Sequence, residues 1–203
     1  HLDQWADDIA IFCSTLSISS PVVFGQSFGG MVAMHYAARH PKGISKLILS
    51  STAAQFRLDE TVKMMRKLGG HRAADVAHEF FSNPSKAAYE TYGEVCLPLY
   101  SNPNLPAAGT FRDRAIERPE VAFHFFSDEM ATMDMRAEIA NITCPTLVIG
   151  GAIDPVTPTI CSEAIADAIG DNARLQMLEG CGHGPHRDDP KGAEKIMRHF
   201  LAD

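Results

Sequence analysis

Three side chains in this sequence have the types and the chain order needed for nucleophilic catalysis. Ser27 stands in the run Gly-Gln-Ser-Phe-Gly, directly after the apolar residues 22–24. Asp154 and His183 each follow a later apolar run. A serine hydroxyl is a poor nucleophile until a base takes its proton. His183 can be that base, and Asp154 can hold its tautomer and stabilise the imidazolium, which is the chemistry of acyl transfer by a Ser–His–Asp triad.

The residues around Ser27 are typical of a nucleophile elbow, a sharp turn between a strand and a helix. Gly25 and Gly29 are expected to flank the turn because a side chain at either position would collide across it. The helix that follows would aim its positive end and the backbone N–H of Phe28 at a developing oxyanion. The same five residues also fit an ordinary glycine-rich turn with a capping serine, so the rest of the chain must distinguish the two.

Other residues compete for the roles of base and acid. His186 lies three positions after His183, but His183 is favoured because it sits in a Gly-His-Gly turn directly after a strand. Asp134 precedes its strand and Asp167 lies inside an expected helix, so Asp154 is favoured as the acid. Helix capping is the alternative role for Asp154.

Neither a metal nor a cofactor is expected. Six further histidines show no ligand spacing with carboxylates or cysteines; they are His35, His40, His71, His78, His124 and His199.

Apolar patterning predicts the elements that position these residues. Helices are expected at residues 2–18, 29–38, 157–169 and 190–201, the second of them apolar almost all round and therefore buried. Residues 22–24 form a continuous apolar run, which predicts a strand that is buried on both faces of a parallel sheet, and residues 44–50 predict a second buried strand. Residues 145–149 and 175–178 predict two further strands. Ser27, Asp154 and His183 each follow such a strand, and the carboxyl ends of parallel strands converge on one crevice.

The alternation of strands and helices stops between residues 53 and 140. This segment predicts several helices, with apolar stripes at Leu58, Val62, Met65 and Leu68, at Val76, Ala77, Phe80 and Phe81, and, within residues 117–133, at Val121, Phe125, Phe126 and Met130. A loop with Pro98, Pro103, Pro106 and Gly109 separates the last two stripes. We expect residues 53–140 to form a helical cap between two parts of an α/β core, residues 1–52 and 141–203.

Composition narrows the classes of protein. The 203 residues are 45% hydrophobic and 21% charged, which is typical of a globular chain. The net charge of -7 argues against a nucleic-acid partner. No apolar run approaches the roughly 20 residues that span a bilayer, and no signal-peptide pattern opens the sequence. Five scattered cysteines without a CxxC pair favour reduced thiols, so we expect a cytoplasmic protein with no membrane partner.

Four segments carry a resemblance to a known family: residues 25–30, 144–150, 154–158 and 182–183. They resemble the α/β-hydrolase superfamily and, more narrowly, its proline iminopeptidase-like branch. The resemblance implies an α/β-hydrolase fold and a cofactor-free serine hydrolase that works through an acyl-enzyme. It further implies an aminopeptidase that cleaves a small amide or short peptide. The elbow differs from that of proline iminopeptidases, which more often reads Gly-Gly-Ser-Trp-Gly.

Substrate-binding residues are suggested mainly by this resemblance. In proline iminopeptidases, acidic residues of the cap bind the free amine of the substrate, and Glu129, Asp128 and Glu79 are the candidates here by location. Gln26, beside the nucleophile, is a further candidate. A carboxylesterase, lactonase or perhydrolase on the same triad is the alternative activity. A hydrolase fold that binds a ligand without turnover is the alternative of another class. Dehalogenase and epoxide hydrolase activities are disfavoured because related enzymes have an aspartate at the position of Ser27.

The family carries about four strands before the elbow, together with a loop that donates a second oxyanion amide. Here the sequence starts in the helix that precedes the elbow strand, and only the Phe28 N–H can be assigned as an oxyanion donor. The elbow strand is therefore expected to leave an apolar edge unpaired, which proteins normally avoid. We expect the missing part to come from an N-terminal remainder of the same protein, from a separate polypeptide or from a homo-oligomer.

Overall fold

A four-stranded parallel sheet forms the centre of the computed structural model, which describes residues 1–102, 116 and 118–203. Its strands are β1 (Val22–Gln26), β2 (Lys46–Ser50), β3 (Thr146–Gly151) and β4 (Ala173–Leu178), in the spatial order β1-β2-β3-β4. In this register Phe24 lies opposite Ile48, and Ile48 lies opposite Leu147. The predicted α/β class with a parallel sheet is confirmed.

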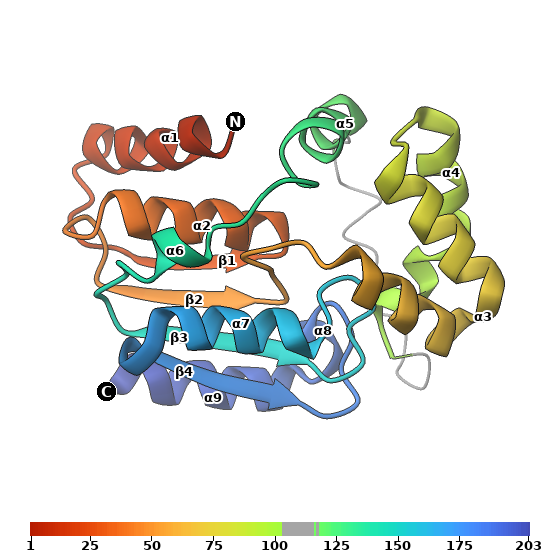
Figure 1. Cartoon of the computed structure of the whole chain (residues 1–203). Helices are drawn as coiled ribbons and strands as arrows, with labels where there is room; N and C mark the ends of the chain where they lie inside the picture. Colours follow the sequence, from red (N-terminus) through yellow and green to blue (C-terminus); the bar gives the residue numbers. More distant parts are fainter. Residues whose placement is uncertain (103–115, 117) are drawn as a thin grey trace.

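Helices cover both faces of the sheet (Figure 1). One face carries α1 (Leu2–Thr15), α2 (Phe28–Arg39), α6 (Arg136–Ile139) and α7 (Thr159–Ile169). The other carries α9 (Pro190–Ala202), whose Ala193 and Phe200 pack in a cluster with Ile48 and Leu147. Two short turns, η3 (Gly170–Asn172) and α8 (Pro185–Asp188), complete this part of the chain. Because helices lie on both faces, every residue of β3 is buried.

β1 is partly exposed, which corrects one expectation. Val22 and Phe24 are 46% and 47% exposed, so β1 is not buried on both faces as its apolar sequence predicted. The described core cluster under α9 contains residues of β2, β3 and β4 but none of β1. β1 also lies at the edge of the described sheet.

Further helices lie beyond the carboxyl ends of the strands (Figure 1). They are α3 (Leu58–Ser82), α4 (Lys86–Val95), η1 (Leu97–Tyr100) and α5 (Pro119–Asp128). The two predicted stripes around residues 58–68 and 76–81 belong to α3, which is kinked at Gly70, where φ is 74°. α4 was not predicted. Pro103, Pro106 and Gly109 lie outside the described residues, and the domain boundaries at 53 and 140 remain a prediction.

Aromatic side chains hold these helices together. Phe80 of α3 contacts Tyr92 of α4 and Phe126 of α5, with ring centroids 4.6 and 5.3 Å apart. Aromatic pairs at such distances stabilise beyond their buried area. Thr61 of α3 also donates a hydrogen bond to the Val156 carbonyl, 2.9 Å away, so this group of helices is tied to the loop after β3. Within the part of the chain that the structure describes, no helix is long and apolar enough to cross a membrane.

Candidate active site

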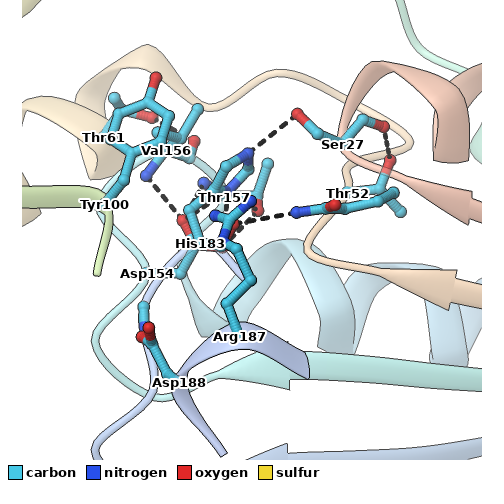
Figure 2. Close-up of polar contacts among 12 residues, drawn as sticks. Ser27, Thr52, Thr61, Tyr100, Asp154, Val156, Thr157, His183, Arg187 and Asp188 are labelled. Atoms are coloured by element: carbon cyan, nitrogen blue, oxygen red, sulfur yellow. Dashed lines mark hydrogen bonds and ion pairs between the residues drawn. The ribbon is translucent and has the colours of Figure 1, made fainter. Parts of the chain in front are cut away.

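Ser27, Asp154 and His183 meet at the carboxyl edge of the sheet (Figure 2). Each directly follows or closely follows a strand: Ser27 comes after β1, Asp154 after β3 and His183 after β4. Nε2 of His183 lies 2.9 Å from Ser27 Oγ. Nδ1 of the same ring lies 2.9 Å from Asp154 Oδ2 and 3.0 Å from Oδ1. The three residues therefore form a continuous hydrogen-bonded chain from hydroxyl to carboxylate.

Ser27 occupies a strained backbone position. Its φ is 52° and its ψ is -124°, an arrangement that non-glycine residues rarely adopt. The Ser27 N–H donates to the Ser50 carbonyl of β2 at 3.0 Å. The Ser27 carbonyl accepts from Thr52 Oγ1 at 2.7 Å and from the Gly30 N–H at 2.9 Å. These bonds hold the turn in the geometry that presents the side chain at the sheet edge.

The glycines around the turn have different roles. A Cβ at Gly25 would lie 2.5 Å from the Gly29 carbonyl oxygen, so this position requires glycine. A Cβ at Gly30 would lie 2.6 Å from the Thr52 side chain. A Cβ at Gly29 would meet nothing within 4 Å. The expectation of a collision at Gly29 was therefore wrong, and close packing instead involves Gly25 and Gly30.

Asp154 is fully buried and accepts hydrogen bonds on both oxygens. Oδ1 accepts from the N–H groups of Val156 and Thr157, at 2.8 and 2.9 Å, and Oδ2 accepts from the Thr157 hydroxyl at 2.8 Å. Burial alone would raise the pKa of Asp154, but the charge and hydrogen bond of His183, with these amides, outweigh it and lower the pKa below its ordinary value. The carboxylate is therefore ionised beside the imidazole at neutral pH.

The backbone of His183 is held on both sides. Its N–H donates to the Tyr100 carbonyl at 2.7 Å, and the Tyr100 ring meets the imidazole edge-on with centroids 5.0 Å apart. Its carbonyl accepts from Gln26 Nε2 at 3.1 Å and from Arg187 Nη2 at 2.9 Å. Gln26, expected as a substrate-binding residue, is instead placed to orient the loop that carries His183.

The rival residues lie apart from this chain of hydrogen bonds. The ring of His186 faces Phe24, with centroids 6.2 Å apart, and its pKa is lowered by burial and by the charge of Arg187. Asp134 pairs with Arg136 at 2.5 Å, and Asp167 is exposed on α7.

The backbone N–H of Phe28 is placed to serve the oxyanion. Phe28 is the first residue of α2, and the first amides of a helix have no acceptor inside it. The Phe28 ring is fixed by the Trp5 and Phe125 rings, each 4.8 Å away between centroids. The role of this amide stays a prediction.

A cavity of about 370 Å³ opens onto Ser27 and His183. Its other described walls are apolar, aromatic or small and uncharged: Phe28, Met31, Phe56, Phe80, Phe81, Tyr89, Tyr92, Gly93, Leu97, Tyr100, Ala122, Phe125, Phe126, Met130, Val156 and Thr157. The hydroxyls of Tyr92 and Tyr100 lie 2.8 Å apart in this wall. No aspartate, glutamate, lysine or arginine is among the described lining residues. The cavity therefore suits an uncharged, largely apolar group.

The acidic residues expected to bind an amine lie elsewhere. Both carboxylate oxygens of Glu129 are 3.1 Å from the Leu2 N–H, and Oε1 is also 3.3 Å from His1 Nδ1. Asp128 and Glu79 are exposed. None of the three belongs to the described lining of the cavity. Glu129 therefore binds the start of α1, and a role for it in binding substrate stays a prediction.

The cysteines are poor alternatives to Ser27 as a nucleophile. All five cysteines are free. Burial raises the pKa of the Cys96 and Cys181 thiols to about 11 and that of Cys161 to about 12, so these thiols stay protonated at neutral pH. Among the residues whose placement is described, no group of three His, Cys, Asp or Glu side chains could hold a metal ion.

Three residues that support the site were not predicted from the sequence. Thr52 supports the Ser27 carbonyl, Tyr100 contacts His183, and Asp188 accepts a hydrogen bond from Gly182 N–H at 2.7 Å. No motif marks them, because contacts with backbone groups and ring edges leave no pattern in residue type.

Comparison with known proteins places these features in context. The model of a family described as alpha/beta hydrolase fold matches residues 1–190. Strigolactone esterase D14 of Arabidopsis thaliana is 26% identical over 98% of this chain and 73% of its own length. A proline iminopeptidase of Lactobacillus delbrueckii subsp. lactis is 24% identical over 97% of this chain and 70% of its own length. A pimeloyl-[acyl-carrier protein] methyl ester esterase of Chromobacterium violaceum is 29% identical over 80% of this chain and 63% of its own length.

Solved structures show the same fold. MenH from S. aureus aligns with a TM-score of 0.72 and 22% identity, covering 100% of this chain and 75% of that one. An alpha/beta fold family hydrolase from Bacillus anthracis str. Sterne aligns with a TM-score of 0.74 and 17% identity, covering 98% of this chain and 73% of that one.

Proposed function

The chain belongs to the alpha/beta hydrolase fold family, and we propose that it acts as a serine hydrolase on carboxylic esters with an uncharged, apolar acyl group. One observation carries this proposal. The hydrogen-bonded chain Ser27–His183–Asp154 opens onto a cavity of about 370 Å³ whose described walls hold no aspartate, glutamate, lysine or arginine. A nucleophile with its base and acid in place needs only a substrate that fits this apolar space.

In the proposed first step, Ser27 Oγ attacks the ester carbonyl carbon as its proton passes to His183 Nε2, 2.9 Å away. The resulting imidazolium is stabilised by Asp154, which already accepts its Nδ1–H. Negative charge moves onto the former carbonyl oxygen, where the Phe28 N–H at the positive end of α2 would donate to it.

In the proposed second step, the tetrahedral intermediate collapses and the bond to the alcohol oxygen breaks. The His183 Nε2–H protonates the leaving alkoxide, and the acyl group stays on Ser27 Oγ. A water molecule, deprotonated by His183, then attacks the acyl-enzyme. Release of the acid returns the proton to Ser27 and restores the resting site.

An ester is favoured over an N-terminal amide because the described cavity offers no carboxylate to a substrate amine. A buried ammonium group without a partner would be strongly disfavoured. Esterases among the relatives support this choice, while the proline iminopeptidase supports aminopeptidase activity as the second candidate. Lactone or perhydrolase chemistry would use the same residues.

The test compares the two substrate classes on one preparation. We expect p-nitrophenyl esters with short, medium and aromatic acyl groups to be hydrolysed at rates that depend on Ser27. Prolyl-p-nitroanilide, with its free amine, should be a poor substrate. Ser27→Ala and His183→Ala are the controls, and a fluorophosphonate probe should label Ser27 only.

Hydrolysis of the prolyl anilide in preference to every ester would overturn the substrate assignment. An apolar ester that binds without turnover, with no labelling of Ser27 by the probe, would show a ligand-binding protein instead of an enzyme.

A further inference from the structure

We propose that Asp188 is a positioning residue that couples the segment after α4 to the loop carrying His183. Asp188 is 9% exposed, and one of its carboxylate oxygens, Oδ2, joins two parts of the chain. It accepts the Gly182 N–H at 2.7 Å and the Asn102 N–H at 3.1 Å. The inference rests on the proposed function for its catalytic meaning, because the group that Asp188 positions is the proposed base.

Local structure brings Asp188 to this point. The single turn α8 (Pro185–Asp188) begins two residues after His183, and the Asp188 N–H donates to the Gly184 carbonyl at 3.1 Å. This single helical turn therefore brings the side chain of Asp188 next to Gly182, the residue that precedes His183. Figure 2 shows Asp188 below His183, on the side away from Ser27.

The loop needs such support because its own side chains provide little. His183 stands between Gly182 and Gly184, which have no side chain to pack. Glycine residues leave a loop with more conformational freedom than any other residue type. Hydrogen bonds to the backbone are then the means by which this loop keeps one conformation.

The same short segment of chain supplies the other anchors. The Tyr100 carbonyl accepts the His183 N–H at 2.7 Å, and Asn102 Nδ2 donates to the Gly180 carbonyl at 2.7 Å. Residues 100–102 thus bind the loop at two backbone groups, the Gly180 carbonyl and the His183 N–H, and Asp188 links the Asn102 N–H to the Gly182 N–H between them. A carboxylate that accepts two amides is a strong anchor, because hydrogen bonds to ionised groups are shorter and stronger than neutral ones.

The consequence for the proposed chemistry is geometric. The imidazole lies within hydrogen-bond distance of both Ser27 and Asp154 only while the loop keeps its position. A displacement of about 1 Å in a catalytic group can cost about 100-fold in rate. Loss of the Asp188 anchor should therefore lower kcat and leave substrate binding almost unchanged.

The neighbouring residue provides a matched control. Asp189 caps α9, where its Oδ1 accepts the Gly192 N–H at 2.9 Å, whereas the Gly182 N–H donates to Asp188. Asp188→Ala and Asp189→Ala remove the same group from adjacent positions, and each should lower Tm by several degrees, about what the loss of a cap or a buried hydrogen bond costs. Only Asp188→Ala should change the site.

Two readouts test this in the full chain. On the best ester substrate, kcat should fall about 10- to 100-fold in Asp188→Ala, with KM changed less than about threefold. In Asp189→Ala, kcat and KM should both stay at the parent values. In proton NMR, the downfield signal of the His183 Nδ1–H, bonded to Asp154, should persist in the parent and in Asp189→Ala. It should broaden or disappear in Asp188→Ala. If Asp188→Ala does not fold, Asp188→Asn replaces it in the test. We expect Asp188→Asn to lose about three- to tenfold in kcat and to shift the His183 Nδ1–H signal.

The inference is overturned if the signal and kcat of the Asp188 variants match those of the parent, or if KM alone rises. The NMR signal also separates the two proposals. A signal lost in Asp188→Ala but kept in Asp189→Ala, in a protein that cleaves no ester, would sustain the positioning role and refute the proposed function. An active esterase with an unchanged signal in Asp188→Ala would sustain the proposed function and refute the positioning role.

Discussion

Replacing Asp154 by asparagine tests the chemistry of the site while almost preserving its shape. The amide oxygen can take the place of Oδ1, which accepts from the Val156 and Thr157 N–H groups. The amide nitrogen then takes the place of Oδ2, 2.9 Å from His183 Nδ1. Because that nitrogen is a donor, His183 Nδ1 must become an acceptor, and the ring proton moves to Nε2.

The magnitude follows from the tautomer. With a proton on Nε2, His183 cannot take the proton of Ser27 Oγ, which lies 2.9 Å away. The same exchange in a Ser–His–Asp triad lowers kcat about 10⁴-fold. This corresponds to about 5 kcal/mol of lost transition-state stabilisation. Folding should be affected far less, because both backbone amides keep an acceptor.

The assay is kcat/KM for the best ester, together with the rate of inactivation by a fluorophosphonate. Thr157→Val is the matched control, since it removes one hydrogen bond to Asp154 Oδ2 but leaves the carboxylate charged. We expect it to cost no more than about tenfold, the equivalent of a single hydrogen bond. A folded Asp154→Asn variant with more than about one tenth of the parent activity would refute the reasoning, as would an equal loss in Thr157→Val.

Four further substitutions test packing, electrostatics and the cavity. Gly30→Ala should lower the free energy of unfolding by about 1–3 kcal/mol, because the new methyl group would overpack against Thr52. Gly29→Ala should raise the free energy of unfolding slightly, because its new methyl group would meet nothing within 4 Å. Urea titrations that find Gly30→Ala more stable than Gly29→Ala would contradict this. Hydrogen bonds from Arg136 lower the pKa of Asp134 from 3.8 to about 2, so their stabilisation is complete above pH 3.8 and is lost as the pH falls through 2. Asp134→Asn should therefore be less stable than the parent by at most about 1 kcal/mol at neutral pH, given the exposure of the pair, and the difference should vanish near pH 2 in acid-unfolding curves. Gly93→Leu, at a wall position where a Cβ would come no closer than 3.8 Å to its neighbour, should shift ester preference toward short acyl groups by about tenfold, and an unchanged chain-length profile would exclude this cavity as the acyl site.

The parts of the fold set by local patterns could be predicted from the sequence. Apolar residues marked all four strands, as expected for a parallel sheet, but β3 is buried along its whole length whereas β1 and β4 are partly exposed. Since residues at the carboxyl ends of such strands share one edge, Ser27, Asp154 and His183 could be expected to meet there. The structure brings them within hydrogen-bond distance of one another.

The parts set by long-range contacts could not be predicted. Glu129 was expected near the substrate from its place in the chain, but the packing of α5 brings it to the start of α1. Gln26 and Asp188 bind backbone groups, which leave no signature in residue type. α4 went unnoticed because a helix of ten residues with one fully buried side chain, Tyr92, has no apolar stripe long enough to recognise.

The order of the strands has a consequence for how the chain folds. β1 and β2 are close in sequence and joined through α2, and β3 and β4 are likewise joined through α7, so each pair can form from local contacts. Pairing of β2 with β3 must close the segment from residue 51 to residue 145. Closing a flexible loop of about a hundred residues costs about 4 kcal/mol of chain entropy, and pairings of this kind are slow. Ser27 lies on one side of that closure and both Asp154 and His183 lie on the other. The elbow and the His–Asp pair can therefore form early and separately, and reactivity of Ser27 should be among the last properties to return on refolding.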